Sequence, residues 1–237
     1  SWLPGVSRIS RLRRDAPRQG GYDVRIDMRI VVYNILKGGE GRADPLAEVI
    51  EAQKADIVAL IEADDLTVLD RIAGRLKMEV IHAPAGKHAV ALLSRWPIVN
   101  SVNHGALWET PAGCLLEAGV RTTGGDVIVG VTQSEDPQDQ PVADAFAQHR
   151  QAGTLHLVCG SLQAPERLLQ LGYIDLLAGA QSQEAQASSA QPPRQTDAIL
   201  AHGVDPSKVK SAWVEQDRLA VYASDHFPVG VEIDGLE

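Results

Sequence analysis

The chain has 237 residues and a formal net charge of −9, and 44% of its residues are hydrophobic. This length and apolar content are typical of one large α/β domain with a full core, and the negative charge argues against broad nucleic-acid binding, which depends on Lys and Arg neutralising phosphates. The apolar runs fall short of the roughly 20 residues that a membrane span needs, so we expect a soluble protein, with the cytoplasm favoured.

Residues 1–27 differ from the rest of the chain. They hold six arginines against three aspartates, a net charge of +3, which leaves −12 for residues 28–237. We interpret 1–27 as a basic N-terminal arm or leader and 28–237 as the folded domain. A basic arm can bind an anionic partner, but a flexible leader is the simpler interpretation.

The first part of the domain alternates strands and helices. The β-branched run Met28–Tyr33 predicts a buried strand, and Asp44-Pro45 predicts a helix start with Asp44 as the N-cap. Asp56–Ile61 is a second apolar run and predicts another buried strand. Apolar residues three or four positions apart over 68–76 predict a second helix.

Short strands dominate the remainder. We expect helices around 141–151 and 165–171 and a hairpin turn at Thr123-Gly124-Gly125. The stretch 178–193 is rich in Ala, Gln and Ser and predicts a mobile loop. The expected strands lie at about 78–83, 89–93, 98–107, 114–121, 127–132, 155–159, 196–200, 208–214 and 229–233. So many short strands with few helices favour two packed sheets with the helices outside.

Polar residues stand at the ends of several predicted strands. Asn34 ends the first strand, Glu62 follows the second, and Asp225 precedes the last. A carboxylate at the end of a buried strand suits Mg²⁺, which takes oxygen ligands and needs few from the protein. The alternative for Glu62 is an acidic first turn of the following helix, and Ser224-Asp225 is also a common turn sequence.

Five segments in this order resemble the endonuclease/exonuclease/phosphatase family, the group of deoxyribonuclease I. They are Val32-Tyr33-Asn34, Leu60-Ile61-Glu62, Leu92–Ile98, Gln195–Ile199 and Ser224-Asp225-His226. The resemblance extends from Met28 to about Ile233. It implies a four-layer α/β sandwich, in which two mostly antiparallel β-sheets are flanked by helices.

The resemblance also implies roles for particular residues. Glu62 would be the main ligand of Mg²⁺ or Mn²⁺, with Asn34 and Asp225 close to it. Asp197 would orient His226 and favour its charged form, so that the imidazolium stabilises charge on a phosphoryl oxygen. His226, Asp197 and Asn34 would thus be the catalytic residues.

Two segments depart from the family pattern. Where the family has Gly-Asp-x-Asn, this chain has Gly160-Ser161-Leu162-Gln163, and where a strand ends in His-Leu it has Val131-Thr132-Gln133. In the family the Asp deprotonates the attacking water, and serine has no basicity near pH 7 to replace it. Gln163 keeps an amide on a longer side chain, and Thr132 in place of the His keeps only a hydroxyl.

Other residues near these segments complete the candidate site. Ser161, Gln163 and Thr132 are the predicted substrate contacts, together with His88, which precedes a strand where relatives often have a polar residue facing the cleft. The alternative for His88 is a surface histidine in a Gly-Lys-His loop. Three nearby acids are candidates for a substitute base: Glu135, Asp136 and Glu166.

Two functions are compatible with these residues. One is a Mg²⁺-dependent phosphoester hydrolase of weak or altered activity, acting on a small-molecule or lipid-linked phosphoester. The other is a catalytically inactive pseudoenzyme, with the metal kept or lost, that binds a phosphorylated ligand or a protein partner.

Overall fold

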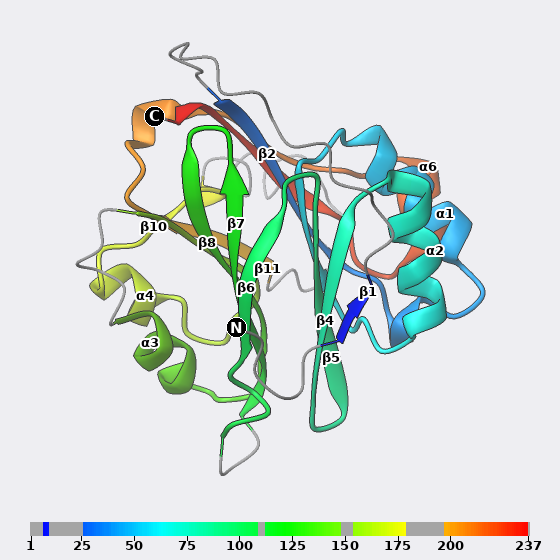
Figure 1. Ribbon diagram of the computed structural model, residues 1–237, viewed down its shortest axis with the longest axis horizontal. Coiled ribbons are helices and arrows are strands. Elements are labelled where there is room, and N and C mark those ends of the chain that lie inside the picture. Colours follow the sequence, from blue (N-terminus) through cyan, green and yellow to red (C-terminus); the bar gives the residue numbers. More distant parts are fainter. Residues whose placement is uncertain (1–6, 10–25, 109–111, 148–153, 179–196, 237) are drawn as a thin grey trace, which may run out of the picture.

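The computed structural model describes residues 7–9, 26–108, 112–147, 154–178 and 197–236 (Figure 1). The predicted loop over 178–193 lies outside these ranges from residue 179 onward. Within the described ranges no helix is long and apolar enough to cross a membrane.

The described strands form two sheets. A seven-stranded sheet has the order β1-β4-β5-β3-β2-β13-β12, and a six-stranded sheet has the order β10-β11-β9-β8-β7-β6. Among the described pairs, β2–β3 and β8–β9 are parallel and the others antiparallel. The strands are β1 Ser7–Ile9, β2 Ile26–Asn34, β3 Ile57–Ile61, β4 Glu79–Ala85, β5 His88–Ser94, β6 Ile98–Asn103, β7 Gly113–Thr122, β8 Gly125–Ser134, β9 Leu155–Ser161, β10 Ile174–Asp175, β11 Asp197–His202, β12 Val209–Val214 and β13 Val229–Leu236.

Helices cover the outer faces of both sheets (Figure 1). The helices α1, α2 and α6 lie outside the seven-stranded sheet, and α3 and α4 lie outside the six-stranded sheet. Their bounds are α1 Ala43–Ala52, α2 Leu66–Leu76, α3 Gln140–Ala147, α4 Glu166–Gln170 and α6 Arg218–Ala223, and short 3₁₀ turns cover Lys37–Gly39 and Pro206–Lys208. This four-layer arrangement confirms the predicted fold class.

The core divides according to the period-two alternation of strand side chains. Val32, Ile61, Val131 and Ile199 all point between the two sheets and are fully buried there. Their sequence neighbours point outward against the helices, as Tyr33 does beneath α1 and α6. A strand position therefore tells which layer its side chain enters.

Some expectations about the elements were wrong or incomplete. The strands β1 and β10 were not predicted, and β1 pairs with β4 although it lies within residues 1–27. The strand predicted over 98–107 ends at Asn103, because the Asn103 side chain accepts a hydrogen bond from Ala106 N and forms a turn.

The start of α1 also differs from the prediction. Arg42, not Asp44, is the N-cap residue, and it makes no side-chain capping bond. Asp44 lies in the first turn and pairs instead with Arg71 of α2 at 2.5 Å. The Arg42 guanidinium instead binds backbone carbonyls outside the helix, among them Ile35 O.

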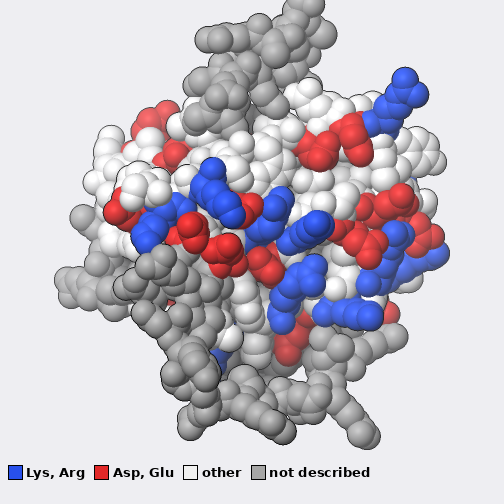
Figure 2. All heavy atoms as spheres, turned by 90° about the horizontal axis from the view of Figure 1, so that it is seen from above, with Lys and Arg blue, Asp and Glu red and all other residues white. Residues whose placement is uncertain are grey.

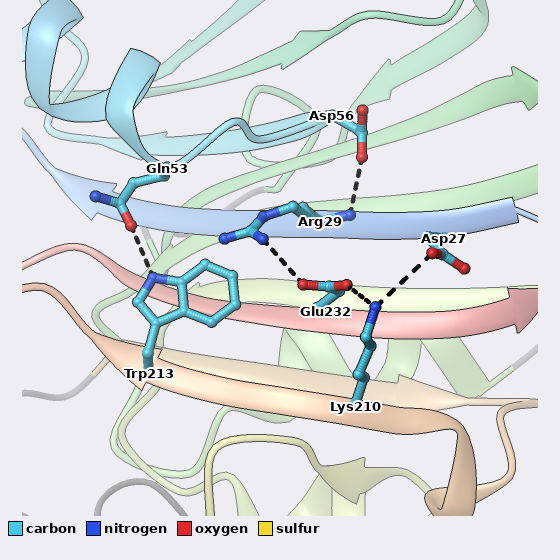
Figure 3. A network of polar contacts seen from close by, with 7 residues as sticks. All are labelled: Asp27, Arg29, Gln53, Asp56, Lys210, Trp213 and Glu232. Atoms are coloured by element: carbon cyan, nitrogen blue, oxygen red, sulfur yellow. Dashed lines mark hydrogen bonds and ion pairs between the residues drawn. The ribbon is translucent and has the colours of Figure 1, made fainter.

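A polar network covers part of the outer face formed by β2, β13 and β12 (Figure 3). Glu232 accepts from Arg29 at 2.9 Å and from Lys210 at 2.7 Å, and the Arg29 guanidinium lies 4.6 Å from the centroid of the Trp213 ring. The Trp213 indole N–H donates to Gln53, which follows α1, at 2.8 Å. This network ties the edge of the sheet to the helix layer.

Charges of both signs are interspersed over the end of the molecule that Figure 2 shows. Neither sign forms a continuous patch among the residues coloured there.

The close approach of β8 and β9 provides a test of the fold. Gly160 has φ +134°, and a Cβ at this position would lie 1.9 Å from Thr132 O. We expect Gly160→Ala to lower the free energy of unfolding by roughly 1–3 kcal/mol, measured by urea denaturation.

Gly74 in α2 is the matched control, because a Cβ there meets no atom within 4 Å. Gly74→Ala should raise the free energy of unfolding by about 0.5–1 kcal/mol, since alanine favours the helix. Equal effects of the two substitutions would contradict the pairing of β8 with β9.

Candidate active site

Polar side chains from both sheets meet at one end of the sandwich, where β2, β3 and β9 end and β11 begins. On the seven-stranded sheet, β2 ends at Asn34, and Glu62 follows β3 directly. On the six-stranded sheet, β9 ends at Ser161 and β11 begins at Asp197, which is its register partner. The sheet packing therefore brings together residues that are far apart in sequence.

Glu62 has a left-handed backbone, with φ +54°. Regular alternation would place its side chain opposite to that of Ile61, against the helices. The left-handed backbone breaks this alternation, and the carboxylate instead accepts hydrogen bonds from Asn34 Nδ2 at 3.1 Å and from Lys37 N at 2.8 Å. Leu36 and Lys37 also have positive φ, so backbone strain is concentrated around Glu62. Such strain costs on the order of 1–3 kcal/mol per residue and is typical of functional sites.

The surroundings of Glu62 keep it ionised. Burial alone would raise its pKa, but the hydrogen bonds from Lys37 N and Asn34 and the positive charges of His88 and His226 outweigh burial and lower the pKa. His88 and His226 therefore both lie within electrostatic reach of the carboxylate. His88 Nδ1 also lies 4.0 Å from Asp64 Oδ2, so His88 belongs to the group rather than to the remote surface.

The Asn34 side chain is held by hydrogen bonds within the protein, one of them to Glu62. Its side chain is buried, its Nδ2 donates to Glu62, and its Oδ1 accepts from Leu36 N at 2.9 Å. Both ends of the amide are thus engaged within the protein. Asn34 is a positioning residue in this arrangement.

Asp197 and His226 form an ion pair across the two sheets. Asp197 is 1% exposed, and its Oδ2 lies 3.7 Å from His226 Nδ1. Asp197 raises the pKa of His226 against the opposing effect of burial, and the negative charges of Asp225 and Glu62 add to the rise. The imidazolium is therefore favoured beside the Glu62 carboxylate.

The loop that carries Asp225 and His226 is tied to the end of β2. Ser224 Oγ donates to Asn34 O at 2.8 Å and accepts from His226 N at 3.3 Å. The Arg42 guanidinium donates to the carbonyls of Ile35, Leu36 and Ala223. Arg42 was not singled out from the sequence, because a lone Arg before a helix carries no pattern that marks it.

The register of the six-stranded sheet corrects the assignment of Thr132. Thr132 is fully buried on the face toward α3, and its hydroxyl donates to Cys114 O at 2.9 Å, so it does not reach the site. Its neighbour Gln133 lies on the inner face and pairs in register with Ser161, which in turn pairs with Asp197. Gln133 Oε1 is buried and has no hydrogen-bond partner among the described residues. Gln133, not Thr132, stands at the level of the site.

In the described part of the chain, the remaining candidates form no hydrogen bond or ion pair with Glu62, Asp197 or His226. Gln163 is exposed, and its Nε2 donates to Ser134 O at 3.3 Å. Asp136 Oδ1 accepts from Gln138 N at 2.8 Å in the turn before α3, and Glu166 lies in the first turn of α4. Glu135 is the candidate substitute base whose negative charge contributes to the raised pKa of Cys114. Cys114 pairs in register with Gln133, so Glu135 lies near that part of the site.

The donor set fits a hard divalent cation. Glu62 and Asp225 would hold it, because an ion such as Mg²⁺ keeps several waters and takes only one or two carboxylates. Each Glu62 oxygen accepts one hydrogen bond and retains a second lone pair. Within the described ranges no three His, Cys, Asp or Glu side chains form a ready-made metal cluster.

A family model described as "Endonuclease/Exonuclease/phosphatase family" matches residues 31–226. The chain belongs to this family. No curated protein matches it in sequence.

Solved structures of the family share its fold at low sequence identity. The Bacteroides vulgatus endonuclease/exonuclease/phosphatase has a TM-score of 0.67 at 16% identity, over 90% of this chain and 100% of that chain. An AP endonuclease from Archaeoglobus fulgidus has a TM-score of 0.64 at 16% identity, over 87% and 99%. D. rerio TDP2, complexed with a single-strand DNA product, has a TM-score of 0.63 at 15% identity, over 87% and 98%.

The ion pair between the sheets makes a first prediction about the site. Asp197→Asn should lower the pKa of His226, because it removes the negative charge that favours the imidazolium. Histidine proton NMR titration measures this shift, and a His226→Gln variant assigns the resonance. An unchanged pKa would contradict the pairing.

The same pair makes stability depend on pH. A raised folded-state pKa stabilises the protein fully below the unfolded value of about 6.5, and this contribution is lost as pH rises through the folded-state value. The loss of stability in Asp197→Asn should therefore be larger at about pH 6 than at about pH 9.

A second prediction concerns Arg42. Arg42→Met keeps the apolar stem but leaves three carbonyls without their donor, so the free energy of unfolding should fall by roughly 1–3 kcal/mol. Hydrogen exchange at Lys37 N should accelerate as well. Arg71→Met is the control, because it removes an exposed ion pair worth at most about 1 kcal/mol.

Proposed function

We propose that the protein hydrolyses phosphoester bonds with Mg²⁺ or Mn²⁺ held by Glu62 and Asp225, at a rate below that of a site with a carboxylate base. The observation that carries this proposal is that the Asn34–Glu62 and Asp197–His226 pairs act on one another electrostatically across the two sheets. Glu62 is ionised and oriented, and His226 favours its charged form beside it.

Each protein group has a stated task in this proposal. A bound divalent ion polarises the phosphoryl group and lowers the pKa of its water. Glu62 holds its place because Asn34 and Lys37 N fix both carboxylate oxygens. The His226 imidazolium stabilises negative charge on a phosphoryl oxygen, and buried Asp197 keeps the proton on the ring.

The water-activating group is the weak part of the site. Ser161 and Gln133, which lie in register with Asp197, supply a hydroxyl and an amide rather than a base. Loss of a positioned base costs roughly 10²–10⁴ in rate. Enzymatic enhancements of phosphate-ester hydrolysis reach about 10²¹, so measurable turnover survives such a loss.

The charge distribution supports a small phosphoester as substrate. The AP endonuclease and the TDP2 complex act on or hold DNA, whereas this chain has a net charge of −9. A single phosphoester needs only the local cations around Glu62. We therefore favour a small molecule over a polynucleotide.

The same Ser161 and Gln133 favour a second candidate function, a pseudoenzyme that binds a phosphorylated ligand without turnover. A hydroxyl, an amide and the imidazolium of His226 are all hydrogen-bond donors for a phosphate. The buried and unpartnered Oε1 of Gln133 also fits a polar ligand beside it.

Hydrolysis of a generic phosphomonoester and phosphodiester with Mg²⁺ or Mn²⁺ separates the two functions. We expect slow turnover that Glu62→Ala abolishes, because the ionised carboxylate is lost. Activity that survives Glu62→Ala would refute the metal-centred proposal. A silent wild type together with an active Ser161→Asp/Gln163→Asn variant would favour the pseudoenzyme.

The register of β8 adds a matched pair to this assay. Added to the restored variant, Gln133→His should increase the rate by about 10²-fold, because it places a charged donor at the level of Ser161. Thr132→His should only destabilise the protein, because Thr132 is buried beneath α3. The reverse result would overturn the assignment of Gln133 to the site.

A further inference from the structure

A cavity of about 420 Å³ lies between the turn that joins β4 and β5 and the segment that precedes β7. Apart from Glu135, a candidate base, its residues take no part in the chemistry proposed for Glu62 and His226. Its lining is Pro84, Ala85, Gly86, Lys87, Gly105, Ala106, Trp108, Gly113 and Glu135.

The cavity is next to the candidate active site. Lys87 directly precedes His88, whose charge acts on Glu62. Cys114, the residue after Gly113, pairs in register with Gln133, and its thiol donates to Ala85 O at 3.4 Å. The cavity therefore continues the row formed by Asp197, Ser161 and Gln133 along the same end of the sheets.

The lining indicates a neutral polar ligand. Lys87 and Glu135 are both exposed and carry opposite charges, so they suit a group that offers both hydrogen-bond acceptors and donors. Trp108 is held in place because it packs partly against the core beneath α3. Its remaining surface provides an apolar wall, and aromatic side chains in such sites typically contact rings.

The size of the cavity further limits the class of ligand that it can bind. Ligand sites span about 300–1,000 Å³, so this one is at the small end. An acyl chain would need a longer slot without charged side chains at its walls. The cavity thus argues against a lipid-linked phosphoester and for a compact one.

We infer that this cavity binds the alcohol portion of a small phosphoester, a neutral hydroxyl- or amino-bearing ring of about nucleoside or hexose size. The inference rests on the proposed function, because the phosphate of the same ligand would lie at Glu62 and His226. Nucleosides and sugars share the chemistry that Lys87, Glu135 and Trp108 recognise, and the experiment distinguishes them.

Calorimetric titration with phosphonates tests the inference without turnover, since a phosphoester hydrolase does not cleave their phosphorus–carbon bond. The probes are a nucleoside phosphonate, a hexose phosphonate and butylphosphonate, with Mg²⁺ present. One of the two ring compounds should bind at least about tenfold more tightly than butylphosphonate. The ring compound that binds more tightly shows whether the cavity accepts a nucleoside or a sugar.

Two neighbouring substitutions locate the binding. Ala106→Trp fills the cavity from an exposed position and should abolish the preference for the ring, with a loss of about tenfold or more. Leu107→Trp adds the same side chain at the next residue, which is 58% exposed and does not line the cavity, and should leave binding unchanged within about twofold. Glu135→Gln, which keeps the size of the side chain, should weaken ring binding several-fold.

Equal affinity for all three phosphonates, or equal effects of Ala106→Trp and Leu107→Trp, would overturn the inference. Absence of binding by every phosphonate would overturn it as well. If the protein binds the ring compounds selectively but hydrolyses neither phosphoester, the proposed function is refuted and the ring-binding site is still supported.

Discussion

The face-to-face packing of two sheets is the constraint on which the rest of this structure depends. Alternate side chains of both sheets must be apolar to fill the layer between them, and those of Val32, Ile61, Val131 and Ile199 are. Burying an unpaired polar group in that layer would cost several kcal/mol, on the order of 2–7. Asn34, Gln133, Ser161 and Asp197 are polar residues of the inner faces that lie at one end of the sandwich, and the candidate active site is located there.

Local backbone strain at this end then orients the Glu62 carboxylate. The left-handed conformation of Glu62 redirects its carboxylate toward Asn34, and the hydrogen bonds from Asn34 and Lys37 N compensate part of the strain. Arg42 and Ser224 bind the neighbouring loops to one another, so that the segment with Asp225 and His226 stays beside β2. The oriented carboxylate is thus supported by contacts between neighbouring loops.

The chemistry of the site is uneven. Glu62 is held by two hydrogen bonds and has a lowered pKa, and His226 pairs with buried Asp197 and has a raised pKa. The groups in register beside them, Ser161 and Gln133, are neutral hydrogen-bonding side chains. In our proposal this site binds a phosphate but activates water poorly, and the adjacent cavity recognises the rest of the ligand.

The sequence by itself predicted most of the strands, and the family resemblance predicted the four layers and proposed the candidate site residues. Period-two burial is encoded locally, and the segments ending in Asn34, Glu62 and His226 are recognisable because the fold requires them at strand ends. The positions of Asp197 and His88 near this group were also predicted, the first from the family resemblance.

Only the tertiary structure decided which of two adjacent residues in a strand faces the site. A shift of one residue reverses the face of a side chain, and the pairing of β8 with β9 is what assigns Gln133 to the site and Thr132 to the buried layer beneath α3. The role of Arg42 and the cavity beside Trp108 were equally out of reach, because both depend on contacts between segments distant in sequence. Local patterns specify which face of an element is apolar, whereas register and loop packing are set by the whole chain.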